Sequence, residues 1–363
     1  MLDEKLLRSE EAAVFRLRDL YRRHGYLPYR MSKFEEYDLY VRNKDFLVSD
    51  RVITFNDTNG KLLALKPDVT LSIIRSGEDV PGVKQKVYYN ENVYRVSERT
   101  HRFKEIMQAG LECIGDTDLY DVYEVISLAA QSLALISDDF VLEISHLDVL
   151  SAALTRACPD EGFRERALVC IAEKNAHDLQ RLCCDCGVDA QAAQALMVLI
   201  TAYGARSQVL DALRAVCPAQ EIAELETLSA LLDAAPHNER IVFDFSVVNS
   251  MNYYNGFVFK GYLDGICDGV LAGGQYDRMM EKLGRCSGAI GFAMYLDLLE
   301  QLRQDRADYD VDVLLLYDAA AGSAAVARTV QKLLAAGKTV SAQKAAPEKL
   351  RWRETVDLRG EGR

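Results

Sequence analysis

Two long β-type segments lie close together in the first third of the chain, and they constrain its fold more than any other feature. Residues 86–95 and 104–115 each form a strand-like run of at least ten residues, and residues 96–103 form a polar connection between them. Two long strands joined by so few residues pair as antiparallel neighbours. The chain is therefore expected to contain a large antiparallel sheet.

Helices and further strands are expected on both sides of this pair. Residues 8–24 carry apolar side chains at helical spacing, and Gly25 follows as a stop signal. Residues 118–135 predict a second helix, which Asp116, Thr117 or Asp118 can cap. Residues 288–302 are apolar at helical spacing and predict a third helix. Shorter strands are predicted at residues 46–48, 52–55, 62–65, 141–144, 241–245 and 257–259, with a hairpin turn at 57–60.

The element pattern divides the chain into a core and an appendage. Residues 147–238 are rich in Ala and Leu with little strand signal, which predicts a helical insertion in a core that spans residues 1–302. After a charged linker, a strand (311–317), a helix (324–336) and a short strand (337–340) predict a small α/β appendage over residues 308–363. The fold class is α+β, an antiparallel sheet flanked by helices.

Charge and composition argue against several functions. The net charge is −12, whereas nucleic-acid binders usually present a basic face. No apolar run approaches the ~18 residues that span a bilayer, and the charged N-terminus does not resemble a signal peptide. We expect a soluble, cytoplasmic protein that does not enter a membrane.

Metal and cofactor signatures are also missing from the sequence. Cys183, Cys184 and Cys186 form a cluster without the paired partners that tetrahedral zinc requires, so reduced thiols are the simpler interpretation. No phosphate-binding P-loop and no G-x-G-x-x-G motif occurs. We expect neither a metal nor a cofactor.

Residues 107–113 alternate between polar and apolar side chains. In a strand, Gln108, Gly110 and Glu112 share one face and the four apolar residues share the other. An amide, a gap and a carboxylate could line the pocket of a small polar ligand. A solvated face of an antiparallel sheet would give the same pattern.

Two other segments place polar groups beside expected elements. Asp68 and Thr70 precede a helical stretch, where they could cap the helix or hold an ammonium group. Tyr253 and Tyr254 stand beside an Asn-Gly turn, and Tyr276 follows paired glycines that permit close backbone approach. Tyrosines of this kind could equally be core residues with a satisfied hydroxyl.

Taken together, these segments resemble the catalytic core of histidyl-tRNA synthetases and of their paralogue, the regulatory subunit of ATP phosphoribosyltransferase. The likeness covers residues 5–302 and implies a class II aminoacyl-tRNA synthetase-like fold. The matching blocks are KPDVT (66–70), VYRVSERTHRFKEIMQAGLECIG (93–115), MNYYNGFVF (251–259), LAGGQYDRMMEKLG (271–284) and AIGFAMYLDLLEQL (289–302).

The resemblance implies a histidine pocket at the positions already singled out. Its amino-acid end would be held by Asp68, Thr70 and Gln108. Its imidazole would face Glu112 and Tyr254, and Tyr253 and Tyr276 would line the walls. A carboxylate that pairs with an imidazole N–H rejects ligands that lack this group.

The catalytic positions of the synthetases have changed. Asn249 and Leu298 occupy positions where the family's synthetases carry arginines, and bulky Tyr295 replaces a small glycine in space that ATP needs. Fixed cations are a main device for stabilising phosphoryl charge. Arg95 and Arg102 persist as residual anion contacts, which do not rebuild the site. We expect no catalytic residue.

The resemblance therefore favours a non-catalytic regulatory subunit in histidine biosynthesis. It would bind histidine and associate with a short-form ATP phosphoribosyltransferase catalytic subunit, whose activity and feedback control depend on it. A homodimer built on the N-terminal region, within a larger hetero-oligomer, is implied. The short appendage leaves no room for a complete anticodon reader, so no tRNA is expected. The alternatives are a divergent amino-acid-activating ligase or histidyl-tRNA synthetase-like enzyme, and a tRNA-sensing or scaffold protein.

Overall fold

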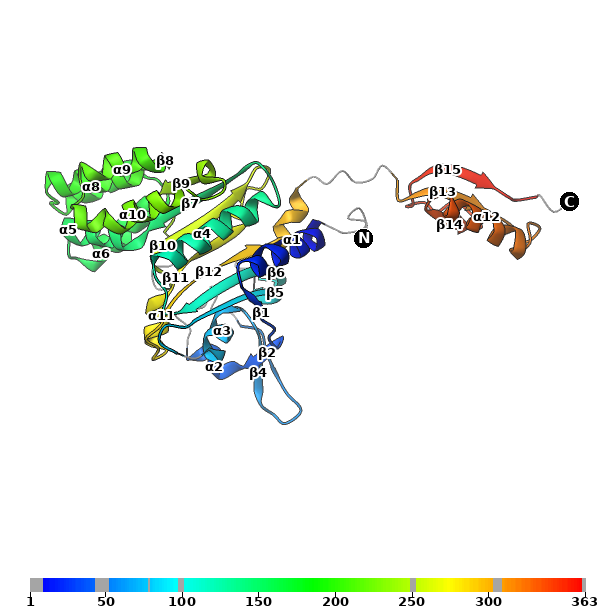
Figure 1. The fold of residues 1–363 in the computed structure, drawn as a ribbon, viewed down its shortest axis with the longest axis horizontal. Coiled ribbons are helices and arrows are strands. Elements are labelled where there is room, and N and C mark those ends of the chain that lie inside the picture. Colours follow the sequence, from blue (N-terminus) through cyan, green and yellow to red (C-terminus); the bar gives the residue numbers. More distant parts are fainter. Residues whose placement is uncertain are drawn as a thin grey trace. The chain divides into compact units, whose positions relative to one another are not determined.

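The computed structural model describes residues 9–42, 52–77, 79–96, 101–248, 253–302 and 309–360. The chain separates into two compact units, Met1–Leu302 and Arg303–Arg363. Figure 1 shows the ribbon with its elements labelled. Each unit is described by itself.

A nine-stranded mixed sheet forms the centre of the first unit, in agreement with the predicted α+β class. Its strand order is β1-β5-β6-β12-β11-β10-β7-β9-β8. The pairs β1·β5 and β7·β9 are parallel, and the other neighbours are antiparallel. The strands are β1 (Leu27–Pro28), β5 (Lys84–Val96), β6 (Phe103–Gly115), β7 (Phe140–His146), β8 (Tyr203–Ala205), β9 (Ile241–Asp244), β10 (Asn255–Leu263), β11 (Leu271–Gln275) and β12 (Gly288–Tyr295).

The predicted hairpin of long strands is confirmed as β5 and β6, which pair along thirteen consecutive residues from Lys84↔Gly115 to Val96↔Phe103. The apolar face of β6 carries Ala109, Leu111 and Cys113, which are at most 2% exposed. Because the side-chain period of a strand is two residues, this register fixes which face Gln108 and Glu112 occupy.

Two helices cover the apolar face of the sheet. These are α1 (Ser9–Arg23) and α4 (Leu119–Ala134), both at predicted positions (Figure 1). The side chain of Asp118 accepts hydrogen bonds from Tyr120 N and Asp121 N, and Asp121 bonds back to the backbone of Asp118, which completes a capping box. Leu133 of α4 meets the sheet at Gly261, where an added Cβ would lie 2.6 Å from Leu133 Cδ1.

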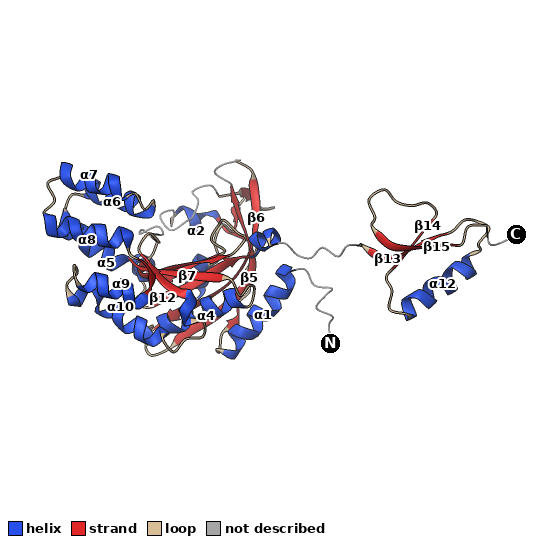
Figure 2. Cartoon of the chain, turned by 90° about the horizontal axis from the view of Figure 1, so that it is seen from above, coloured by secondary structure: helices blue, strands red, loops and turns tan. Residues whose placement is uncertain are grey.

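Helices make up most of the segment that follows β7, and Figure 2 shows them gathered at one end of the sheet. A short strand, β8, lies among them and forms one edge of the sheet. The helices are α5 (Leu147–Ala157), α6 (Glu161–Ala172), α7 (Ala176–Asp185), α8 (Ala190–Thr201), α9 (Arg206–Arg214) and α10 (Ala219–Leu232), followed by the 3₁₀ helix η3 (Asn238–Arg240).

A second layer packs on the other face of the large sheet. It contains a small antiparallel sheet of order β2-β4-β3 and three short helices. The predicted turn joins β3 to β4, and Gly60 adopts φ +80° there. The strand predicted at 46–48 lies outside the described residues. The elements are β2 (Phe34–Glu36), α2 (Tyr37–Val41), β3 (Thr54–Asn56), β4 (Leu62–Leu65), α3 (Thr70–Ser76) and α11 (Asp277–Lys282).

The helix predicted for residues 288–302 is wrong. This segment forms β12 (Gly288–Tyr295), followed by the 3₁₀ helix η4 (Leu296–Gln301). β12 lies between β6 and β11, and the consecutive residues Ala289 to Phe292 are all buried. Both faces of the strand are therefore covered, and its sequence is apolar without strict alternation. Periodicity alone does not distinguish such a strand from a buried helix.

The second unit contains a parallel sheet of order β14-β13-β15 and one helix. The predicted strand–helix–strand unit is β13 (Val311–Leu316), α12 (Ser323–Ala335) and β14 (Val340–Gln343). The sequence analysis missed β15 (Trp352–Asp357), whose polar side chains are mostly exposed. Among the described residues of both units, no helix is long and apolar enough to cross a membrane.

The face of the sheet that α1 and α4 cover should contribute most to the stability of the first unit. Phe259 on β10 is fully buried and contacts Phe292 edge-on at 6.3 Å. Phe259→Ala should lower the free energy of unfolding by about 3–5 kcal/mol. Phe103→Ala, at a side chain that is 76% exposed, should change it by no more than about 0.5 kcal/mol. Urea denaturation measures both, and equal losses would contradict this assignment of the core.

Candidate functional site

Three rows of side chains cross the sheet on the face opposite α4. Residues that pair directly across neighbouring strands point to the same face, so the strand register defines each row. We call them the acidic row, the small-residue row and the glutamine row. The acidic row is Val87, Glu112, Gly291 and Gly274; the small-residue row is Tyr89, Gly110, Ala293 and Ala272; the glutamine row is Glu91, Gln108 and Tyr295.

Three glycines allow larger side chains to lie flat on this face. An added Cβ at Gly291 would stand 1.7 Å from Glu112 Oε2, and one at Gly110 would stand 2.5 Å from the Tyr89 hydroxyl. At Gly274 it would stand 2.8 Å from Tyr254 Cδ1. Glycine in a strand interior marks such close approaches.

Glu112 lies at the centre of the acidic row and is 2% exposed. Thr70 Oγ1 donates to its Oε1 at 2.7 Å, and the Tyr276 hydroxyl donates to its Oε2 at 2.6 Å. Burial raises the pKa of Glu112 to about 8, against these two hydrogen bonds, which lower it, and Asp68 raises it further. Each carboxylate oxygen can accept a second hydrogen bond, so Glu112 can still receive an N–H donor.

Asp68 supplies a second buried carboxyl group beside Glu112. Burial raises the pKa of Asp68, whereas Arg95 and two backbone N–H groups lower it. One of these is Leu71 N, 3.0 Å from Asp68 Oδ1 at the start of α3. The helix-capping interpretation therefore describes a real contact, and it does not exclude a role in the site.

Two cations stand at the edge of this site. Arg95 Nε donates to Pro67 O at 2.9 Å. Lys66 is fully buried, and its Nζ lies 2.5 Å from Glu91 Oε2. The ion pair joins the residues before α3 to the glutamine row. The sequence analysis missed Lys66 and Glu91, because they meet only where the segment before α3 docks on β5.

Aromatic rings form the remaining walls. Tyr253 lies 4.5 Å from Tyr254 and 6.0 Å from Tyr276, measured between ring centroids. Tyr89 was also missed, although it occupies the β5 position opposite Gly110. Val87 and Tyr89 are two residues apart on β5, so their side chains share one face of the strand. This spacing was the signal that could have identified Tyr89.

The structure brings together six of the seven residues expected in the pocket around one buried carboxyl group, and Gln108, 3% exposed, lies two rows away on the same face. Thr70, expected at the amino-acid end, donates to Glu112 instead. Arg102 is exposed just before β6, ten residues along the chain from Glu112. Leu298 lies on η4 and is partly buried against the main core. Asn249 lies outside the described residues.

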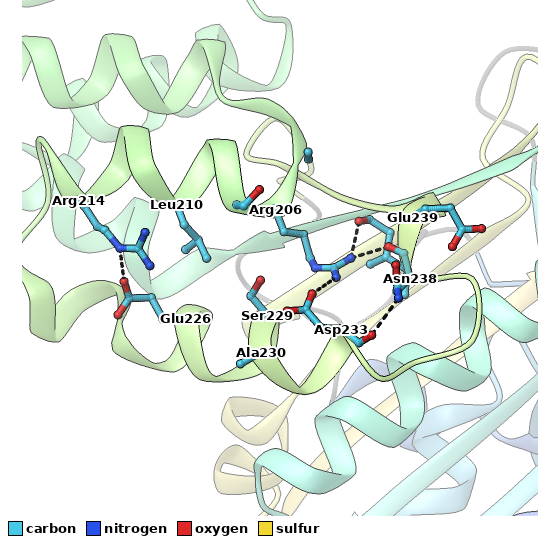
Figure 3. Close-up of a pocket in the computed structure, with 12 residues that line it drawn as sticks. Arg206, Leu210, Arg214, Glu226, Ser229, Ala230, Asp233, Asn238 and Glu239 are labelled. Carbon is cyan, nitrogen blue, oxygen red and sulfur yellow. Dashed lines mark hydrogen bonds and ion pairs between the residues drawn. The ribbon is translucent and has the colours of Figure 1, made fainter.

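The described residues offer no other site of comparable character. None of their His, Cys, Asp and Glu side chains form a group of three that could hold a metal ion, and the nine cysteines are unpaired. Figure 3 shows a cavity of about 400 Å³ beside α9 and α10. There Arg206 donates to Asn238 O, Ile241 O and Asp233 Oδ1, and Arg214 pairs with Glu226. Because these cations are neutralised internally, we assign this cavity no ligand.

The fold and the buried acidic site define a class of protein. The family model described as histidyl-tRNA synthetase matches residues 2–299. The chain therefore belongs to the histidyl-tRNA synthetase family and has its class II synthetase-like fold.

Individual relatives narrow the comparison. The chain is 28% identical over 283 residues to the ATP phosphoribosyltransferase regulatory subunit of Oceanobacillus iheyensis, covering 76% of this chain and 69% of the relative. It is 28% identical over 295 residues to the protein of the same name from Clostridium acetobutylicum, covering 78% and 72%.

Solved structures share the fold. An ATP phosphoribosyltransferase regulatory subunit/histidyl-tRNA synthetase from Bacillus halodurans matches with a TM-score of 0.77 at 23% identity, over 97% of this chain and 94% of that one. The ATP phosphoribosyl transferase (HisG:HisZ) complex from Thermotoga maritima matches with a TM-score of 0.63 at 20% identity, over 79% of this chain and 97% of the matched one.

The raised pKa of Glu112 predicts how stability changes with pH. The carboxyl group titrates near 8 in the folded chain and near 4.5 when unperturbed. Between these values the folded protein retains a proton that the unfolded chain has released, so the free energy of unfolding falls as pH rises from 4.5 to 8. Glu112→Gln, which is neutral throughout, should reduce this fall in urea denaturation at pH 5, 6.5 and 8. The exposed Glu173→Gln should behave as wild type, and an unchanged slope in Glu112→Gln would contradict the assignment.

Proposed function

We propose that this chain is a non-catalytic regulatory subunit of ATP phosphoribosyltransferase that binds histidine on the face of its sheet opposite α4, at Glu112. The buried carboxyl group of Glu112, fixed by Thr70 and Tyr276, carries the proposal. Such a group is costly to bury unless a polar partner repays its desolvation. An imidazole N–H is a partner of suitable shape and polarity.

The remaining groups fit the rest of a histidine molecule. Asp68 is the second buried carboxyl group and would receive the ammonium group. Gln108 would bond the amino-acid end, and Arg95 keeps its terminal guanidinium nitrogens for the carboxylate while its Nε bonds Pro67. Tyr253, Tyr254 and Tyr276 would surround the imidazole ring, with Glu112 and Tyr254 facing its nitrogens.

A non-catalytic role is supported by the names of the relatives and by the residues that replace the family's arginines. Leu298 is a hydrocarbon side chain that packs against the core, and Asn249 is uncharged. Neither supplies the fixed positive charge that an arginine offers to a phosphate during amino-acid activation. The competing function, an amino-acid-activating ligase, would require ATP–pyrophosphate exchange that depends on an amino acid.

The partner would be a short-form ATP phosphoribosyltransferase catalytic subunit, in keeping with the regulatory subunits among the relatives and the complex from Thermotoga maritima. A homodimer is supported by the apolar surface of the small sheet, where Phe34, Phe55 and Leu62 are between 38% and 47% exposed. The net charge of −12 gives no support to tRNA binding. Feedback control requires histidine to bind two quaternary states with different affinities.

Calorimetry of the purified chain tests the ligand. Wild type should bind L-histidine, and Glu112→Ala should weaken binding at least about tenfold, since a charge-assisted hydrogen bond contributes roughly 1.5–3 kcal/mol. Glu173→Ala removes an exposed carboxyl group at the C-terminal end of α6, outside the three rows, and should leave the affinity unchanged. Equal effects of the two substitutions would contradict a role for Glu112.

Reconstitution tests the partner. The chain should co-purify with a short-form ATP phosphoribosyltransferase and raise its activity, and histidine should inhibit the complex more strongly than the catalytic subunit alone. Glu112→Ala should preserve activation and weaken inhibition, because it removes the group proposed to pair with the imidazole. Histidine-dependent ATP–pyrophosphate exchange by the isolated chain would overturn the proposal.

A further inference from the structure

We propose that Tyr295 sets the length of the ligand that the pocket accepts, so that it admits a free amino acid and excludes one extended at its carboxyl group. This inference rests on the proposed histidine site and names a specificity-determining residue within it. Tyr295 is the last residue of β12 and pairs with Gln108. It therefore stands beside the group that would bond the amino-acid end of the ligand.

The three rows show where the first large side chain of β12 lies in the site. Along β12, the residues that point to this face are Gly291, Ala293 and Tyr295, one in each row. The Glu112 side chain lies over Gly291, and beside it the small side chain of Ala293 pairs with Ala272 on β11. Tyr295 is the first large side chain on β12 in this direction. The run of small residues along β12 therefore ends at the glutamine row.

Two other tyrosines lie over glycines on the same face of the sheet. The Tyr89 ring lies across Gly110 in the small-residue row, and the Tyr254 ring lies over Gly274. Burial raises the pKa values of Tyr89 and Tyr254, and the Tyr295 phenol is among the neighbours that raise both further. The three side chains are thus close neighbours that come from β5, from the residue before β10 and from β12.

The dimensions of the rows place Tyr295 at the carboxyl end of the proposed ligand. Glu112 and Gln108 are four residues apart on one strand, which corresponds to roughly 13 Å between their Cα atoms. An imidazole at Glu112 directs the amino-acid carboxylate toward Gln108 and Tyr295. A group bonded to that carboxylate, as in an amide, an ester or an adenylate, would have to occupy the position of the Tyr295 ring. A clash of this kind discriminates by exclusion rather than by added affinity.

Two amides of histidine isolate this effect. L-Histidinamide and L-histidine β-naphthylamide both lack the carboxylate charge, and only the second is bulky. Calorimetry should show that wild type binds histidinamide at least ~100-fold more tightly than the naphthylamide, since the latter clashes with Tyr295. Tyr295→Gly should reduce this ratio to about tenfold or less. Tyr295→Phe, which keeps the ring and removes the hydroxyl, should retain the wild-type ratio.

Free L-histidine serves as the control for folding and for the site itself. Tyr295→Gly should bind it within about tenfold of wild type, because the residue limits length without holding the imidazole. If wild type binds histidine but treats the two amides alike, or if Tyr295→Gly leaves their ratio unchanged, the role of Tyr295 is overturned and the histidine site stands. If wild type binds no histidine, the proposed function fails and this inference fails with it.

Discussion

The carboxyl group of Glu112 connects the layers on which the candidate site depends. It projects from the central strand β6, and it is held by Thr70 at the start of α3 and by Tyr276 immediately before α11. Each donor belongs to the layer that covers the sheet, so the two hydrogen bonds fix that layer against the strand. Burial of a carboxyl group is unfavourable, and hydrogen bonds to both oxygens offset part of that cost. The same arrangement leaves lone pairs for a ligand.

The charged groups around Glu112 differ in whether they are paired. Asp68 and Glu112 are buried carboxyl groups with raised pKa values, whereas Lys66 and Glu91 form a closed ion pair at the edge. Two carboxyl groups in one enclosed space favour a cationic or N–H-rich molecule. Lys66 is committed to Glu91, so Arg95 is the cation that this part of the described structure offers to an anionic group. These electrostatics suit an amino acid better than a nucleotide.

Much of the fold could be predicted because local and long-range signals agreed. The length of the segments that became β5 and β6, and the alternation from Met107 to Cys113, fixed both the hairpin and its buried face. The polar face remained ambiguous, because alternation does not reveal whether a second layer covers it. The error at residues 288–302 has a related cause: a central strand buried on both faces loses the alternation that identifies strands. β15 was missed because its edge position leaves it polar.

The site was predictable in its members and less so in their contacts. Asp68, Glu112 and Tyr276 were identified from segments far apart in the chain, yet the bond between Thr70 and Glu112 depends on how α3 docks on β6. Tyr89 and Lys66 carried no distinctive local pattern. Tyr89 reaches the site through the register of β5 and β6, and Lys66 through the docking of the segment before α3 on β5. A single sequence specifies neither.

The glycines beneath the site give it an unusual vulnerability. Gly110, Gly274 and Gly291 contribute no functional atoms, but each provides the surface on which a tyrosine or a carboxyl group rests. One methyl group at any of them would lift its overlying group from the sheet. During divergence of related chains, the ability to hold a ligand could therefore disappear while every polar side chain of the pocket was kept. A comparison of the ligand-facing residues alone would miss such a loss, whereas a comparison of these three glycine positions would detect it.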